Sequence, residues 1–342
     1  MDRYYIERTF QLVLTIFAVM SLTFFLIRLL PGGPSDALRA QLRESNPSMS
    51  QAELNRRVQA QLNVMPDEPV HVQYVNYVSD LFRGDMGDSI SQSGTVAEII
   101  AGAAPWTIFV VGSAVLIAFL IGITMGALMA YREGSRFDSG STILSVLTNS
   151  VPDYIYGIIL LWIVGYQIPL FPTGGRYSSE TEPTINLIAP GETFAFVFDA
   201  AYHAALPVIS IILVAWGGWA LGMRGNSIQI LGEDYLRVAR LRGLPRRRIA
   251  LRYVGRNAIL PMYTSMLITI GFLLGGSIII EQVFSYPGMG YYMIEGLNRR
   301  DYPLMMGIFL VITTTVAIAV YIADLTYGLI DPRAGINGGD SG

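Results

Sequence analysis

The sequence predicts an all-α, polytopic membrane protein with six transmembrane helices and a small outer helical subdomain. Of its 342 residues, 52% are hydrophobic and only 14% are charged, whereas a soluble domain has about 25% charged residues. The hydrophobic residues are also grouped into long blocks, which is the pattern that a lipid bilayer requires. Both observations favour a membrane protein over a soluble one.

Six hydrophobic stretches are long enough to cross the hydrocarbon core, which takes about 20 helical residues. The predicted spans lie near residues 9–30, 105–131, 141–165, 203–223, 262–283 and 304–330. The first span follows Arg3 and Arg8 and ends at Pro31. A cleaved signal peptide is the competing interpretation, but its hydrophobic region is only about 7–15 residues long. We therefore expect an uncleaved first helix.

The distribution of arginine predicts the orientation in the membrane. The chain has no lysine, and nine of its 23 basic residues fall in the short segment 224–256. Short cytoplasmic loops carry an excess of positive charge, whereas long segments are translocated largely regardless of charge. We therefore expect a multi-pass protein of the cell membrane with both termini in the cytoplasm.

The long segment 31–104 is expected to form helices on the outer face. Ser50 and Glu53 have the spacing of a capping box, in which each residue caps the other at a helix start. Thr95 and Glu98 repeat that spacing before the second span. The predicted organisation is a first helix at 1–30, an outer helical subdomain at 31–104, and a core bundle at 105–342 with a cytoplasmic loop at 224–261.

The loop 224–261 carries the strongest functional signal. Good helix formers occupy 233–242, Gly243 is suited to end that helix in a left-handed cap, and Pro245 prevents simple continuation. A second helical stretch is expected over about 246–259. The positive-inside rule explains the arginines but not the helix–glycine–helix pattern. A short helix held rigidly below the membrane can insert into a partner's groove, so we favour partner docking.

The sequence EDYLRVARLRGLPRRRIALRYVGRNAILP at 233–261 resembles the cytoplasmic coupling loop of binding-protein-dependent ABC importers. The general pattern is Glu-Ala-Ala, three residues and Gly; here Arg237 takes the place of the Glu, and Gly243 is the glycine. That replacement and the long spacing to Pro261 match the dipeptide/oligopeptide/nickel permease subfamily. The residues that fit its version are Asp234, Tyr235, Arg237, Ala239, Arg240, Gly243, Leu244, Arg256, Asn257, Ala258 and Pro261.

Further motifs extend this resemblance over nearly the whole chain. They are LLPGGPSDAL at 29–38, MPDEPVHVQYVNYVSDLFRGDMGDSI at 65–90, FPTGG at 171–175, EQVFSYPGMG at 281–290, NRRDYP at 298–303 and DPR at 331–333. Together they are similar to the DppB/OppB-like member of the permease pair. The resemblance implies a type I ABC importer-like permease that forms half of a pathway for peptides or similar small solutes, with oligosaccharides and nickel complexes also carried in the family.

The same resemblance implies the partners of the chain. They are a second homologous permease, two cytoplasmic ABC ATPase subunits, an extracytoplasmic solute-binding protein and membrane lipid. ATP and Mg²⁺ are then expected on the ATPase subunits and not on this chain. A Walker A motif needs a lysine, which the chain lacks. With no cysteine and two histidines, no catalytic residue or metal site is expected, and because the chain has no basic tail, no nucleic-acid partner is expected either.

Polar and aromatic residues within the predicted spans are candidates for the solute pathway. The candidates are Asn149, Ser150, Asp153, Trp216 and Trp219 for the pathway lining, and Glu281 and Tyr286 for an outer gate. An ionised residue at the bilayer centre costs about 2.5–3.5 kcal/mol on insertion scales, so Asp153 should face the bundle interior, water or a partner. A structural kink at Pro152 remains the other interpretation. An ion-coupled secondary transporter, with Asp153 as its acid, is the alternative function.

Overall fold

The computed structural model describes residues 2–28, 34–62, 69–178, 190–245, 248–271 and 278–330. Apart from an isolated bridge between Asp88 and Thr95, the regular elements in these ranges are all helices, which confirms the predicted fold class. The chain divides into two compact units. Unit 1 comprises Met1–Thr107, Leu274–Ile278 and Pro287–Gly342, and unit 2 comprises Ile108–Leu273 and Ile279–Tyr286.

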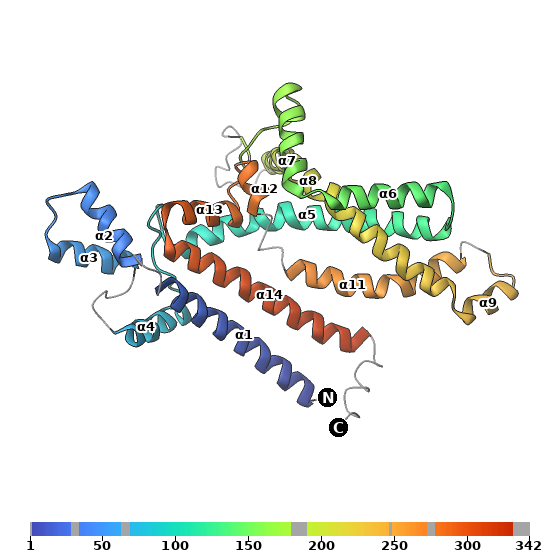
Figure 1. Ribbon diagram of the computed structural model, residues 1–342, viewed down its shortest axis with the longest axis horizontal. Coiled ribbons are helices and arrows are strands. Elements are labelled where there is room, and N and C mark those ends of the chain that lie inside the picture. The colour runs from blue at the N-terminus through green and yellow to red at the C-terminus, as the bar shows by residue number, and fades with distance from the viewer. Residues whose placement is uncertain are drawn as a thin grey trace. The chain divides into compact units, whose positions relative to one another are not determined.

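Two long helices, α1 (Asp2–Arg28) and α14 (Tyr302–Ile330), lie side by side in unit 1 (Figure 1). Polar side chains join them near one end. Arg8 Nη1 lies 3.2 Å from Asp324 Oδ2, and the hydroxyls of Thr9 and Tyr321 are 2.9 Å apart. Large hydrophobic side chains are exposed along much of the remainder of α1, which suits a helix surrounded by lipid.

Three shorter helices of unit 1 occupy the predicted outer segment. They are α2 (Pro34–Ser45), α3 (Gln51–Leu62) and α4 (Val70–Phe82). Helices α2 and α3 pair with each other, and Leu54 and Val58 of α3 are buried. The Glu53 amide donates to Ser50 Oγ at 3.2 Å, as the capping pattern predicts. The segment is therefore helical, and its separate status as a subdomain stays a prediction.

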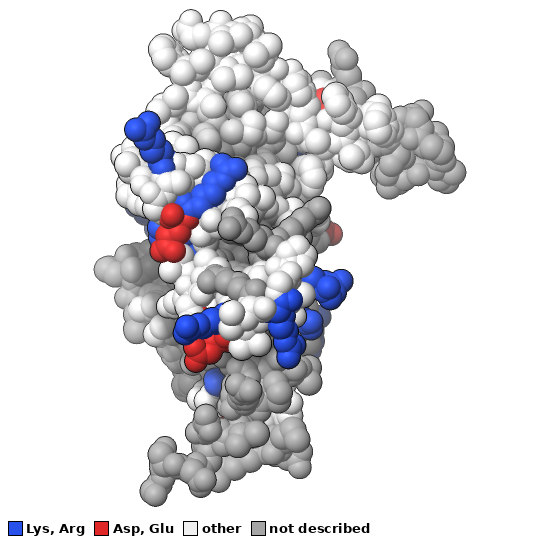
Figure 2. Space-filling model, turned by 90° about the vertical axis from the view of Figure 1, so that its right-hand side faces the viewer, with Lys and Arg blue, Asp and Glu red and all other residues white. Residues whose placement is uncertain are grey.

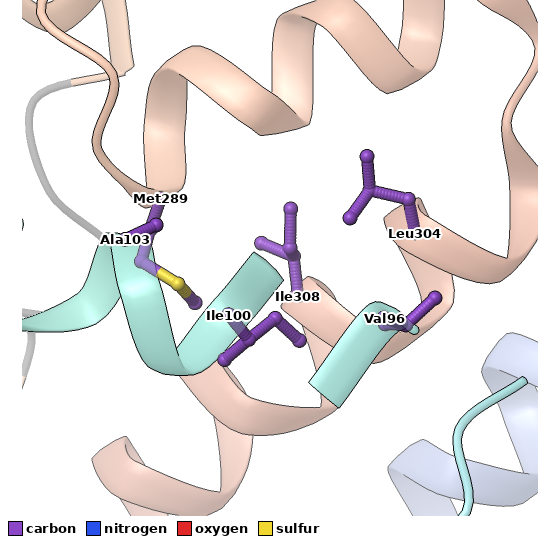
Figure 3. Close-up of a cluster of buried hydrophobic side chains, with 6 residues drawn as sticks. All are labelled: Val96, Ile100, Ala103, Met289, Leu304 and Ile308. Carbon is purple, nitrogen blue, oxygen red and sulfur yellow. The ribbon is translucent and has the colours of Figure 1, made fainter. Parts of the chain in front are cut away.

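Helix α5 (Val96–Tyr131) begins at the second predicted capping box. The Thr95 amide donates to Glu98 Oε2 at 3.1 Å, and the Glu98 amide donates to Thr95 Oγ1 at 3.2 Å. The first turns of α5 then pack in unit 1 against α13 (Met289–Arg299) and α14. The buried residues of this cluster are Val96, Ile100, Ala103, Met289, Leu304 and Ile308 (Figure 3).

Unit 2 holds the remainder of α5 and most of the other helices. They are α6 (Arg136–Ser150), α7 (Asp153–Leu160), the π-helix η1 (Leu161–Gln167), α8 (Pro190–Leu231), α9 (Asp234–Leu241), the π-helix η3 (Ile249–Gly255), α11 (Arg256–Gly271) and most of α12 (Ile278–Val283). Helix α6 runs alongside α8 over its length (Figure 1).

The described residues contain four single helices that are long and apolar enough to cross a membrane. They are Tyr5–Leu26, Val96–Tyr131, Phe194–Leu231 and Tyr302–Leu325. A fifth would combine α6 with α7 and η1, but that pair is bent by 89°. The predicted span at 141–165 therefore contains a sharp bend at residues 151–152. Pro152 has no amide to continue the hydrogen-bond ladder, and its ψ of 145° is not helical. The predicted span 262–283 lies partly outside the described residues.

Candidate functional site

Helix α9 follows α8 almost without a break. Only Gly232 and Glu233 separate the two helices. Both belong to the turn that ends α8, because the Gly232 amide donates to Gln229 O at 3.2 Å and the Glu233 amide donates to Ile230 O at 3.0 Å. Because this link is short and hydrogen-bonded, a displacement of α9 acts directly on the end of α8.

Gly243 ends α9 in the left-handed conformation that the sequence predicts. Its φ is +70°, and no neighbouring atom lies within 4 Å of the place where a Cβ would be. Beside it, the Leu244 amide donates to Ala239 O at 3.3 Å, which satisfies one of the last carbonyls of the helix. The glycine is therefore needed for its backbone angle and not for lack of space.

One side of α9 is buried in an apolar cluster. Leu236 and Ala239 pack with Ile249 and Val254 of η3. The predicted helical stretch at about 246–259 is π-helical over 249–255 and continues as α11 from Arg256, and residues 246–247 lie outside the described part. A π-helix is bonded from residue i to i+5, so residues five apart share a face. This geometry turns both Ile249 and Val254 toward α9.

A hydrogen-bond bridge joins α9 to the start of α11. Asn257 Nδ2 donates to the Tyr235 hydroxyl at 3.0 Å and to Tyr253 O at 2.9 Å. The structure thus brings together two of the residues that the sequence singles out. Pro261 lies inside α11, one turn further on, and the side chain of Arg240 is outside the described part.

The opposite side of α9 presents apolar side chains to solvent. Tyr235, Val238 and Leu241 are 40%, 49% and 82% exposed, and their spacing of three residues places them on one stripe. Arg237 and Arg242 are exposed beside this stripe, and arginine side chains are visible on the face that carries α9 (Figure 2). Apolar side chains exposed together on an otherwise polar segment are typical of a protein-binding site. The sequence analysis missed Val238 and Leu241, although their spacing was readable.

The predicted pathway residues on α6 and α7 gather at the bend between these helices. Asn149 Nδ2 donates to Val214 O of α8 at 3.1 Å, and the Ser150 hydroxyl donates to Val146 O at 2.7 Å. Asp153 Oδ1 accepts from the Tyr154 amide at 2.8 Å at the start of α7. Of these three contacts, that of Asn149 reaches another helix and the other two are local, and a role of these residues in lining the pathway stays a prediction.

The two tryptophans of α8 contact α5. Trp216 is buried in an apolar cluster that also contains Ala118 and Met129, and Trp219 meets Phe119 edge to face with ring centroids 5.0 Å apart. Close helix approach explains this packing, since a Cβ on Gly122 would lie 2.3 Å from Trp219 Cβ. Both tryptophans thus have packing contacts, and their pathway role is untested.

The predicted outer-gate residues lie in α12 and just after it. Glu281 belongs to the helix and Tyr286 follows its closing turn; both are buried, and the Tyr286 amide donates to Glu281 O at 2.8 Å. Burial raises the pKa of the Tyr286 hydroxyl, so this group stays neutral. The glycines of the FPTGG motif pack against the same turn, where the Gly175 amide donates to Ser285 O at 3.3 Å. Two sequence motifs therefore meet here, and gating by them stays a prediction.

The described residues contain no group of three or more His, Cys, Asp or Glu side chains that could hold a metal ion. Helix α9 instead has one buried face, one exposed face and a short link to the long apolar helix α8. Helices long and apolar enough to cross a membrane define the chain as an integral membrane protein.

The chain belongs to the family of binding-protein-dependent transport system inner membrane components, which matches residues 122–336. It is thus a permease subunit of an ABC importer, which decides against the secondary transporter.

The oligopeptide transport system permease protein AppB of Bacillus subtilis is 30% identical over 335 residues, covering 97% of this chain and 99% of the relative. The di/tripeptide transport system permease protein DppB of Pseudomonas aeruginosa is 32% identical over 329 residues, covering 94% and 95%. The dipeptide transport system permease protein DppB of Escherichia coli is 31% identical over 343 residues, covering 97% and 98%.

Proposed function

We propose that this permease forms half of the translocation pathway of a peptide importer. Its partners are a second homologous permease, two cytoplasmic ATPases that bind ATP and Mg²⁺, and an extracytoplasmic solute-binding protein. Relatives named as permeases for oligopeptides, di/tripeptides and dipeptides support a peptide as the solute. The arginines of the α8–α11 connection support a cytoplasmic position for α9 and for both termini.

The exposed stripe on α9 is the observation that carries this proposal. Burying a Leu or Val side chain contributes about 1.5–3 kcal/mol. The exposure of Val238 and Leu241 therefore leaves binding free energy that a groove on an ATPase subunit can use. The arginines that flank the stripe suit an acidic rim around such a groove, because complementary charge steers association and fixes register.

The attachment of α9 supports a role in transmitting motion. Its buried face holds it against η3 and the end of α8, and Gly243 and Asn257 fix its two ends. When the ATPases close around ATP, a docked α9 moves with them. That displacement switches the access of the pathway between the two sides of the membrane, as a rigid-body transition.

A tagged purification in mild detergent, with mass spectrometry of the bound chains, tests the proposal. The variant Leu241→Glu places a charge in the stripe, and Phe82→Glu on α4 is its control because Phe82 is 85% exposed and Leu241 is 82% exposed. We expect wild type to retain a second permease and ATPases. Leu241→Glu should lower ATPase recovery about tenfold, which corresponds to about 1.4 kcal/mol, and Phe82→Glu should not. Wild type that purifies alone, or equal losses from both variants, would contradict the proposal.

A further inference from the structure

Helices α6 and α8 are fastened to each other at three levels of unit 2. At one end, the Arg224 guanidinium of α8 binds the Asp138 carboxylate of α6 through both oxygens, with Nε–Oδ1 at 2.6 Å and Nη2–Oδ2 at 2.8 Å. In the middle, a Cβ on Gly217 would lie 2.5 Å from Ser145 O, so the two backbones touch. At the far end, Asn149 donates to Val214 O.

The Asp138–Arg224 pair is the strongest of these fasteners. The Asp138 side chain is only 3% exposed and also accepts from the Gly134 amide at 3.0 Å. A bidentate arginine–carboxylate pair fixes direction as well as distance. Removing one partner leaves a buried charge without its counter-charge, which is costly. The pair thus holds α6 to the part of α8 that lies just before the α9 link.

Helix α6 leads from this pair to the bend that carries Asn149 and Asp153. Asp138 and Asn149 are eleven positions apart, which corresponds to about 17 Å of helix. Helix α5 is bound to the same body, since a Cβ on Gly126 would lie 2.3 Å from Ala220 O of α8. Backbones this close hold α5 against α8.

We propose that the Asp138–Arg224 pair is the positioning contact that carries the movement of α9, through the end of α8, into α6 and its bend. This inference rests on the proposed docking of α9 to an ATPase. Without the pair, the end of α8 still moves with α9, but α6 no longer follows. ATP hydrolysis then continues while the bend stays in place.

A thiol reporter at the bend tests this transmission without any knowledge of the solute. The chain has no cysteine, so Ser150→Cys, at an exposed position, introduces a single thiol. The rate of its reaction with a small maleimide is measured in the purified complex, with and without ATP and vanadate. When the pair is intact, we expect ATP to change the reaction rate at least about fivefold, which is the size of a typical allosteric coupling. In Asp138→Asn we expect a change of less than about twofold, because the coupling is lost. Asp138→Asn should leave both the binding of the ATPases and their rate of ATP hydrolysis unaffected.

Two further variants keep the test decisive. Asp324→Asn breaks the more exposed pair between α1 and α14 and should leave the ATP response intact. If Asp138→Asn does not fold, Arg224→Lys replaces it, because lysine keeps the charge but not the bidentate geometry. An ATP response that survives in Asp138→Asn or Arg224→Lys would overturn the inference. So would the lack of an ATP response in the protein with the intact pair, if its ATPases still hydrolyse ATP. Absence of bound ATPases from the parent complex would instead refute the proposed function.

Discussion

The side-chain amide of Asn257 donates a hydrogen bond to the hydroxyl of Tyr235 at 3.0 Å. One residue thus lies at the start of α11 and the other in the first turn of α9. Asn257 also donates to Tyr253 O in the intervening π-helix. Three elements of the α8–α11 connection are therefore held by one amide, and the direction in which the stripe on α9 points depends on it.

Replacement of Asn257 by alanine should loosen α9. The change removes two hydrogen bonds, each worth about 0.5–1.5 kcal/mol, so local opening should rise about fivefold or more. Trypsin cleavage at the exposed arginines of the connection, such as Arg242 and Arg252, measures this opening in the purified protein. The exposed Asn298 on α13 gives a control, Asn298→Ala. Equal cleavage rates in wild type and both variants would show that the bridge is not restraining α9.

Substitution of Gly243 should act through backbone strain alone. Alanine at φ +70° costs about 1–2 kcal/mol, although the site has room for a Cβ. Gly243→Ala should therefore reduce ATP hydrolysis that depends on the bound permease several-fold, and Gly243→Asn should reduce it less, because asparagine tolerates this conformation. Gly225→Ala on α8 is the control, with open space and no positive φ. If alanine and asparagine at 243 behave alike, strain at the cap is not the cause.

Close packing of α5 on α8 predicts a large contrast between two glycines of one helix. A Cβ on Gly126 would lie 2.3 Å from Ala220 O, whereas nothing lies within 4 Å of a Cβ on Gly102. Overpacking costs about 1–3 kcal/mol even when side chains can adjust, and a backbone carbonyl adjusts less. Gly126→Leu should thus lower the midpoint of thermal unfolding in detergent by at least about 5 °C. Gly102→Leu should leave it near the wild-type value, and similar losses in the two variants would contradict the packing.

The buried carboxylate of Asp301 predicts a local effect in unit 1. Its Oδ2 accepts from the Ser91 amide and from the hydroxyls of Ser89 and Ser91, and its Oδ1 accepts from the Leu304 amide at 3.1 Å. Asparagine replaces one acceptor by a donor, and each buried group left unpaired costs about 1–3 kcal/mol. Amide hydrogen exchange over residues 84–92 should accelerate in Asp301→Asn. The exposed neighbour Asp88 provides the control, Asp88→Asn, and unchanged exchange in Asp301→Asn would refute the role of the carboxylate.

Local sequence signals predicted much of the fold because their physics is local. A capping box needs only Thr95 and Glu98, and a left-handed cap needs only Gly243, so both could be read from the chain. The long apolar spans follow from composition in the same way. A helical stretch over about 246–259 was also predicted, although its π-helical geometry was not.

Long-range contacts account for what the sequence analysis did not predict. Nothing local marks Asp138 and Arg224 as partners, because 86 residues separate them. The size of the bend at Pro152 depends on contacts such as Asn149 with Val214, which only the folded unit supplies. The exposed stripe on α9 was missed for another reason. Tyr235, Val238 and Leu241 look like core positions until the structure shows that the core lies on the opposite face.

Cross-linking from α9 tests whether this helix docks on an ATPase subunit. Because the chain has no cysteine, Leu241→Cys carries a unique thiol for a maleimide–benzophenone reagent, and Phe82→Cys serves as the control. Both variants are irradiated in native membranes, and the attached chains are identified by mass spectrometry. Our account predicts that the thiol at 241 captures an ATPase subunit and that the thiol at 82 does not. Capture of no ATPase at 241, or equal capture at both positions, would contradict it.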